Sequence, residues 1–192
     1  MENLSDADLK KIVDEVVSSL TREMPSKIQK DLSSTPDPAP ETPSAGQKTV
    51  AIGADHGGFS LKGILKGYLE GKGYAVIDCG TNSTDSVDYP DYARAVAQQV
   101  AGGTAWRGIM IDGAGIGSCM AANKVPGARA AMCYDFATAH NSREHNNANI
   151  LTLGAGLIGT NLAKQITDTF LETEFGGGRH ARRVDKIMAI ES

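Results

Sequence analysis

Apolar residues fall into two alternating patterns along this 192-residue chain from residue 49 onward. Short apolar and β-branched runs are typical of buried strands, and they predict strands at 49–54, 74–78, 107–111, 128–133 and 150–153. Between them, apolar residues at helical spacing predict helices around 61–69, 92–100, 120–124, 135–141 and 160–173, with a last helix within 179–192. Strands that alternate with helices in this way predict an α/β fold, in which helices cover both faces of a parallel sheet.

The first 24 residues carry a separate helical pattern. Polar residues there alternate with one apolar stripe, made of Leu4, Leu9, Ile12, Val13, Val16, Val17 and Leu20. Ser5 fits an N-cap, and Pro25 prevents the helix from continuing. Residues 25–48 include a Pro-, Ser- and Thr-rich stretch that predicts an extended linker. We therefore expect a helix at 1–24, a linker at 25–48 and a domain at 49–192.

Two interpretations of the first helix stay open. It packs on its own domain, or its apolar stripe docks on another protein, since a helix of this length is marginally stable alone. A membrane-surface helix is disfavoured because acidic residues match its few basic ones and it has no aromatic anchor. The helix and its Pro-rich linker resemble the encapsulation peptides that direct enzymes into bacterial microcompartments. This resemblance implies a shell or cargo protein as the partner.

Composition narrows the class of protein. The chain is 41% hydrophobic and 22% charged, as in soluble globular proteins. With 19 Lys and Arg against 23 Asp and Glu, it has no basic excess for nucleic acid. Its three cysteines, Cys79, Cys119 and Cys133, form no C-x-x-C pair, which predicts a reducing, cytoplasmic location rather than a disulfide scaffold or zinc ribbon. No apolar run is long enough to span a membrane.

Four groups of residues have the chemistry of a site. Asp55 and His56 follow the first predicted strand, and residues 112–118 (DGAGIGS) form a glycine-rich turn after the third. Residues 143–147 (REHNN) precede the last strand, and residues 176–183 (GGGRHARR) gather three arginines and a histidine. Ligands of parallel sheets bind at the carboxyl ends of strands, glycine-rich turns hold anions, and guanidiniums hold phosphates.

Each group also has a simpler explanation. A glycine-rich turn can serve only to reverse the chain, and a terminal arginine cluster can be a solvated face. Asp55 could cap a helix, and His145 could be an ordinary loop histidine. Their joint occurrence at the strand ends and loops of one predicted sheet favours a site.

Five segments together resemble the type B ribose-5-phosphate isomerases and the related galactose-6-phosphate isomerase subunits: GADHGGF, DYPDYA, GIGSCMAANKVPGARAA, SREHNNANIL and GGGRHARRV. The resemblance covers about residues 49–190. It implies a Rossmann-like three-layer sandwich with a five-stranded parallel sheet. It also implies an aldose–ketose isomerase of sugar phosphates, a homodimer or homotetramer with active sites across the subunit interface, and no metal or other cofactor.

The resemblance further implies roles for individual residues. Asp55 would handle hydroxyl protons, His145 would assist ring opening, and Asp112 stands where many members carry a catalytic cysteine. The phosphate would be bound by a histidine and two arginines, the sugar by a tyrosine and an asparagine, and the enediolate by loop N–H groups. The implied substrate-binding residues are His56, Tyr89, Gly113, Ala114, Gly115, Ile116, Gly117, Asn146, Arg179, His180 and Arg183.

Some positions depart from the family pattern. Asp112 replaces the cysteine, Ala114 replaces a hydroxyl residue, Ser118 stands where one subgroup has a glutamate base, and Gly156 replaces a substrate-contacting arginine. A carboxylate is chemically competent as a base, so we expect Asp112 to replace the cysteine in isomerising ribose 5-phosphate. Two alternatives stay open: a non-catalytic sugar-phosphate-binding or scaffolding subunit of a microcompartment, and an isomerase of a hexose or modified pentose phosphate.

Overall fold

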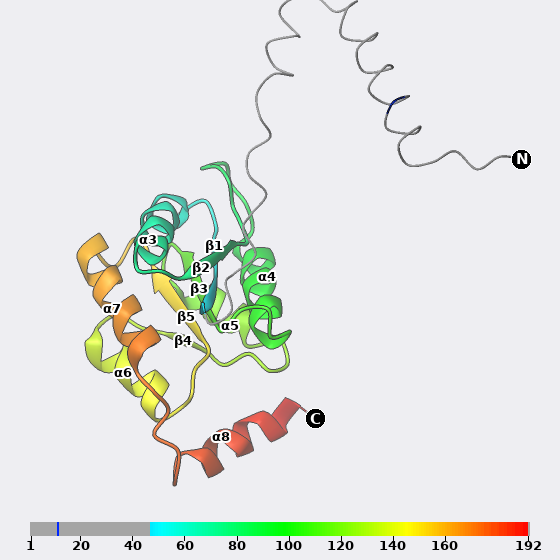
Figure 1. The fold of residues 1–192 in the computed structure, drawn as a ribbon, viewed down its shortest axis with the longest axis vertical. Helices are drawn as coiled ribbons and strands as arrows, with labels where there is room; N and C mark the ends of the chain where they lie inside the picture. Colours follow the sequence, from blue (N-terminus) through cyan, green and yellow to red (C-terminus); the bar gives the residue numbers. More distant parts are fainter. Residues whose placement is uncertain (1–10, 12–46, 192) are drawn as a thin grey trace, which may run out of the picture. The chain divides into compact units, whose positions relative to one another are not determined.

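A five-stranded parallel sheet forms the centre of the fold in the computed structural model, which describes Lys11 and residues 47–191 (Figure 1). The strands are β1 (Thr49–Ala54), β2 (Ala75–Asp78), β3 (Arg107–Asp112), β4 (Ala130–Met132) and β5 (Ile150–Gly154). Their order in the sheet is β2-β1-β3-β5-β4, and every neighbouring pair is parallel. The predicted α/β class and the five-stranded parallel sheet are confirmed.

Helices cover both faces of the sheet and make three layers (Figure 1). One face is covered by α3 (Phe59–Gly71), α6 (Phe136–Glu144) and α7 (Thr160–Glu172). The other face is covered by α4 (Tyr89–Ala101) and α5 (Ile116–Ala122). The chain continues into α8 (Ala181–Met188) and a short 3-10 turn, η1 (Ala189–Glu191). None of the helices in the described part of the chain is long and apolar enough to cross a membrane.

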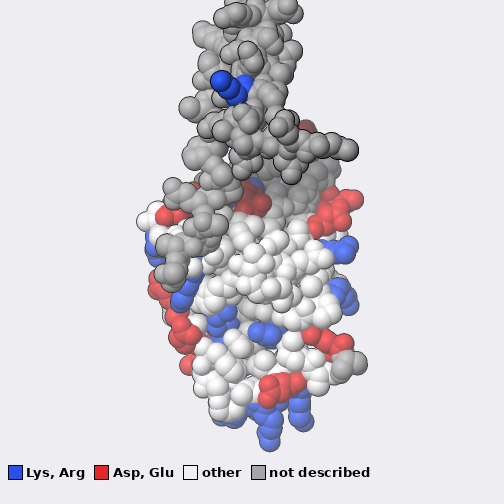
Figure 2. Space-filling model, turned by 45° about the vertical axis from the view of Figure 1, so that its right-hand side comes forward, with Lys and Arg blue, Asp and Glu red and all other residues white. Residues whose placement is uncertain are grey.

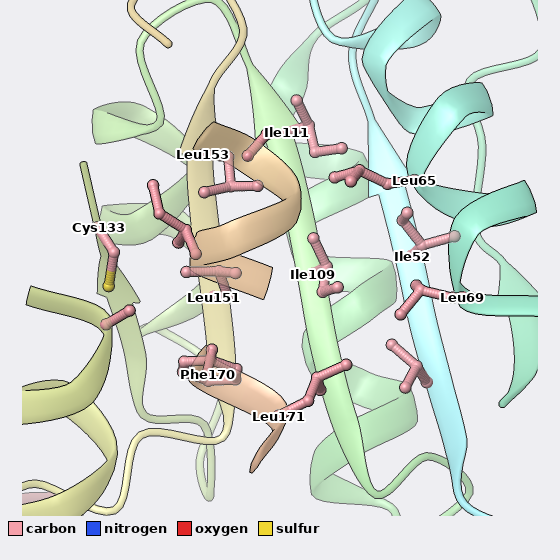
Figure 3. Packing of buried hydrophobic residues seen from close by; sticks show 14 of the residues in the cluster. Ile52, Leu65, Leu69, Ile109, Ile111, Cys133, Leu151, Leu153, Phe170 and Leu171 are labelled. Carbon is pink, nitrogen blue, oxygen red and sulfur yellow. The ribbon is translucent and has the colours of Figure 1, made fainter. Parts of the chain in front are cut away.

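Alternate residues of the central strands pack into two separate hydrophobic cores, because side chains along a strand point to opposite faces. Ile52, Ile109 and Leu151 pack with Leu65, Leu69 and Phe170 from α3 and α7 (Figure 3). On the other face, Ala51, Met110 and Ile150 pack with Val96, Ala97 and Ala122 from α4 and α5. Apolar burial on both faces fixes the strand register. That register in turn fixes which residues stand at the two edges of the sheet.

The helix limits differ from the sequence-based expectation at the glycine-rich turn. The spacing predicted a helix near 120–124, but α5 begins at Ile116, inside the turn. The residue before it, Gly115, has φ of +79°, a left-handed conformation that favours glycine. The chain therefore enters α5 directly from β3, without a long loop.

The chain divides into two units, Met1–Thr42 and Pro43–Ser192. Apart from Lys11, the described residues all belong to the second unit. The predicted helix at 1–24 and most of the linker at 25–48 lie outside the described residues.

Candidate active site

Two aspartates occupy neighbouring positions at the carboxyl edge of the sheet. The register of β1 and β3 pairs Ala54 with Ile111, and the Asp55 N–H donates to the Ile111 carbonyl at 3.1 Å. Asp55 therefore follows β1 directly beside Asp112, the last residue of β3. The sheet order also reverses between β1 and β3, and such a switch point is where open α/β sheets bind ligands.

The Asp55 carboxylate has one protein partner. The side chain is only 7% exposed, and its Oδ1 accepts the Gly58 N–H at 3.0 Å. No hydrogen bond joins its Oδ2 to any residue that the structure describes. A methyl group placed on Gly57 would lie 3.3 Å from the Asp55 Oδ1 and 3.5 Å from the Gly113 nitrogen. The carboxylate and that backbone amide therefore border the same small space.

The Asp112 carboxylate, by contrast, is surrounded by donors from the segment that follows it. Its Oδ1 accepts the N–H groups of Ala114, at 2.8 Å, and of Gly115. Its Oδ2 accepts the Ser118 N–H at 3.1 Å and the Ser118 hydroxyl at 2.5 Å. Asp112 is 4% exposed and Ser118 is fully buried. These four bonds tie the carboxylate to the protein rather than to the solvent.

The glycine loop, residues 113–117, offers further backbone donors. The N–H groups of Gly113, Ile116 and Gly117 donate to no residue in the described part of the chain, although Ile116 and Gly117 begin α5. Helix N-termini and glycine turns with such N–H groups bind anions. The loop is held from behind, because the buried Thr152 hydroxyl donates to the Gly115 carbonyl at 2.9 Å.

Two predicted binding residues lie near the loop on the same edge. A methyl group on Gly117 would meet the Tyr89 ring at 2.5 Å, so the phenol lies directly against the loop backbone. Tyr89 begins α4 and is 40% exposed. The His56 Nδ1 lies 3.2 Å from the Val87 nitrogen and 3.3 Å from the Val87 oxygen, which ties the imidazole to the segment before α4.

Cys133 is buried in the core, and Cys79 and Cys119 are partly buried. Burial raises the pKa of Cys79 and of Cys133 to about 11, and burial also raises the pKa of Cys119. A thiol with a raised pKa is a weak source of thiolate. None of the three therefore takes the place of a reactive cysteine.

A second group of predicted residues lies around His145. This residue follows α6 and precedes β5, so it stands at the amino edge of the sheet. Its Nε2 lies 3.2 Å from the Glu144 Oε2, and its Nδ1 lies 2.8 Å from the Asn141 side-chain nitrogen. Its ring stacks on that of His180, with centroids 4.1 Å apart and planes within 5°. The predicted residue Asn146 is in the same loop, with its side-chain nitrogen 3.4 Å from the Asn141 oxygens.

The basic cluster adjoins this second group. The Arg179 Nε lies 3.4 Å from the His180 Nε2, and Arg183 is an exposed residue in the first turn of α8. Figure 2 shows Lys and Arg side chains gathered at the lower end of the molecule, where Figure 1 places α8. Desolvation and the neighbouring His145 and arginines lower the pKa of His180. The anion-binding groups at this end of the molecule are the guanidiniums of Arg179 and Arg183, which lie near His180.

Arg143, the first residue of the candidate group 143–147, has a structural role that the sequence did not predict. It is 1% exposed, and its guanidinium donates to the Asn147 side chain at 3.0 Å, to the Ala148 carbonyl, and to the Thr173 carbonyl at 3.3 Å. Burial lowers its pKa to about 10. The buried guanidinium therefore holds the loop that carries His145 and Asn146. The sequence could not predict that Arg143 is buried, because its neighbours in the chain are polar.

The two groups stand at opposite edges of the same sheet. Asp55, Asp112 and the glycine loop lie at the carboxyl edge, whereas His145 and Arg179 lie beyond the amino edge, where Figure 1 also shows α8. The six residues of β3 separate the edges by about 17 Å at roughly 3.3 Å per residue. One chain therefore does not bring all the predicted site residues together.

Two hollows of the surface are lined by neither Asp55 nor Asp112. One of about 870 Å³ lies between α3, α6 and α7, with Tyr68, Phe136 and Lys164 in its wall. One of about 480 Å³ lies under α8, where Asn146 and Ile187 line it. No group of three or more His, Cys, Asp or Glu residues in the described part could hold a metal ion.

Comparison with known sequences connects this geometry to a family. Residues 50–187 match the ribose/galactose isomerase family. The ribose-5-phosphate isomerase B of Escherichia coli is 46% identical over 144 residues, which are 75% of this chain and 97% of that protein. The D-erythrulose-4-phosphate isomerase of Pectobacterium atrosepticum is 44% identical over 144 residues, covering 74% of this chain and 95% of the relative.

Solved structures agree with the sequence relatives. The Clostridium thermocellum ribose-5-phosphate isomerase B is 53% identical with a TM-score of 0.74, over 74% of this chain and 97% of that one. The Mycoplasma genitalium ribose-5-phosphate isomerase B with bound ribulose-5-phosphate is 43% identical with a TM-score of 0.73, over 74% and 95%. From residue 50 to residue 187, this chain therefore belongs to the ribose/galactose isomerase family.

Proposed function

We propose that this protein is an aldose–ketose isomerase that interconverts ribose 5-phosphate and ribulose 5-phosphate. The observation that carries the proposal is the pair of carboxylates, Asp55 and Asp112, next to a glycine loop with unused N–H groups. Isomerisation needs a base for the proton beside the carbonyl and donors for the resulting oxyanion. Family membership and the names of the relatives in the preceding subsection support the same reaction.

The phosphate-binding residues that the family resemblance implies are divided between the two edges of the sheet. Of the predicted phosphate-binding residues, His56 lies at the carboxyl edge, and Arg179 and Arg183 lie beyond the amino edge. We therefore propose that each active site combines the carboxyl edge of one subunit with His145, Asn146 and the basic cluster of a second copy. Exposed apolar side chains of α5, Ile116 at 50% and Met120 at 65%, lie beside the glycine loop and fit such a contact.

We accordingly expect a homodimer or a homotetramer built from dimers. Figure 2 looks toward the side that carries α4 and α5 in Figure 1 and shows a broad surface without charged residues, as a subunit interface requires. Light scattering at micromolar concentration should give at least twice the mass of 20.1 kDa. A stable monomer that isomerises sugar phosphates would contradict the shared site.

The choice of substrate depends on two residues near the glycine loop that differ from the family pattern. Ala114 has no hydroxyl, and Gly156 has no side chain where the family pattern has an arginine. A methyl group on Gly156 would lie 3.0 Å from the Gly113 carbonyl, so a side chain there would have to move the loop. The pocket thus has fewer donors for sugar hydroxyls, and substrates of four, five and six carbons all need testing.

Aldose–ketose conversion should be measured with ribose 5-phosphate, erythrulose 4-phosphate and galactose 6-phosphate. We expect ribose 5-phosphate to have the highest kcat/KM, because the relatives with solved structures are ribose-5-phosphate isomerases. Preference for another sugar phosphate would support the isomerase reaction but show that ribose 5-phosphate is not the preferred substrate. Binding of all three without conversion would instead favour the non-catalytic, scaffolding alternative.

The first 24 residues support a second proposal, on location. We propose that they form a targeting helix that docks on a microcompartment shell or cargo protein, because their apolar stripe precedes a Pro-rich linker. The linker has little apolar area to bury against the domain. Its composition therefore favours a tag that functions separately from the isomerase domain.

Deleting residues 1–46 should leave the kcat and the melting temperature of the enzyme nearly unchanged. In the full chain, Ile12→Asp with Val16→Asp should abolish co-purification with a co-expressed shell protein, because both charges enter the apolar stripe. Ser18→Asp, between the apolar positions, is the matched control and should retain binding. Unfolding of the domain after truncation would show that the segment belongs to the fold.

A further inference from the structure

We propose that Asp55 is the base that moves the substrate proton, and that Asp112 is a fixed internal anion that shapes the glycine loop. This inference rests on the proposed isomerase function and deepens it. It differs from the sequence-based expectation, in which the residue at the cysteine position takes the proton. The geometry of the two neighbouring carboxylates carries it.

The Asp112 carboxylate has no lone pair left for a substrate proton. A carboxylate has about four lone-pair sites. Two N–H groups fill those of Oδ1, and the N–H and hydroxyl of Ser118 fill those of Oδ2. Taking a proton requires one donor to be displaced, and at 4% exposure little water can replace it. Asp112 is therefore hindered as a base by the donors that already occupy its oxygens.

The Asp55 carboxylate accepts far fewer hydrogen bonds than the Asp112 carboxylate. The Gly58 N–H is its one donor in the described part of the chain, which leaves Oδ2 without a protein partner. Asp55 stands at the switch point between β1 and β3, where open α/β sheets bind ligands, and its carboxylate shares a small space with the Gly113 N–H. A substrate oxygen bound to that N–H would bring its neighbouring C–H bond close to the Asp55 carboxylate.

The backbone N–H groups of residues 113–118 form two sets, one bonded to Asp112 and one without a partner in the described chain. Those of Ala114, Gly115 and Ser118 are used by Asp112, so they do not bind the enediolate. Those of Gly113 and Ile116, together with Gly117, have no partner in the described chain and are available to the substrate. Asp112 thus selects which part of the loop can serve as an oxyanion site.

The proton transfer balances in charge and atoms. Asp55 removes the proton from C2 of the open-chain aldose, the C–H electron pair forms the C1–C2 double bond, and the carbonyl oxygen O1 becomes negative. Asp55 is neutral while the enediolate is negative, so the crevice keeps its net charge. The proton then returns from Asp55 to C1, and the hydroxyl proton of O2 moves to O1 as C2 becomes the carbonyl.

Exchange of the C1 proton of ribulose 5-phosphate with D2O, followed by NMR in the full-length enzyme, separates the two roles. Asp55→Asn should slow exchange and kcat by about 1000-fold, with KM changed less than about threefold. Added formate should restore part of the exchange in Asp55→Gly by replacing the missing carboxylate. Asp112→Asn should lower the melting temperature and raise KM, with kcat reduced no more than about 10-fold.

Ser118→Ala is the second variant, in case Asp112→Asn does not fold. It removes one donor from Asp112 and frees a lone pair, so turnover should rise if Asp112 is the base. We expect no rise in turnover and a lower melting temperature. Folded Asp112→Asn without exchange, active Asp55→Asn, or faster Ser118→Ala would each overturn the assignment. Wild-type enzyme inactive on every sugar phosphate would overturn the proposed function itself, and with it this inference.

Discussion

The parallel register of the sheet is the constraint on which the rest of this structure depends. Because every strand points the same way, residues that follow β1 and β3 meet at one edge, and residues that precede β5 lie at the other. The two hydrophobic cores fix this register, since a slip by one residue would exchange the side chains that pack in one core with those that pack in the other. The candidate site residues are therefore divided between two edges about 17 Å apart.

At the carboxyl edge, the Asp112 carboxylate and a bound ligand would compete for a limited number of backbone N–H donors. Asp112 and Ser118, two of the positions that the sequence resemblance marked as departures from the family pattern, contact each other directly through the Ser118 hydroxyl and the Asp112 carboxylate. Asp112 and Ser118 therefore form one hydrogen-bonded unit, and their two substitutions are structurally linked. The carboxylate satisfies N–H groups at the start of α5 that would otherwise face a ligand, so the loop keeps its shape before substrate arrives.

Much of this fold could be predicted from the sequence, because apolar runs and helical periodicity report burial directly. The start of α5 could not, since glycines obscure the helical pattern and the left-handed Gly115 acts only in its three-dimensional context. Motifs placed Asp55, Asp112 and His145 in candidate sites. They could not show that the Asp112 carboxylate folds back on its own loop, or that His180 stacks on His145. Those contacts depend on side-chain rotamers and on residues distant in sequence.

We propose that one active site uses Asp55 of one subunit and Arg183 of another. It is tested most directly by mixing the two inactive variants Asp55→Asn and Arg183→Ala under conditions that exchange subunits, at substrate concentrations below KM. A hybrid dimer would carry one doubly substituted site and one intact site. Random exchange makes half of the dimers hybrids, so activity should recover to about a quarter of wild type. No recovery, although mass spectrometry shows hybrids, would place both residues in the site of a single chain and contradict the account.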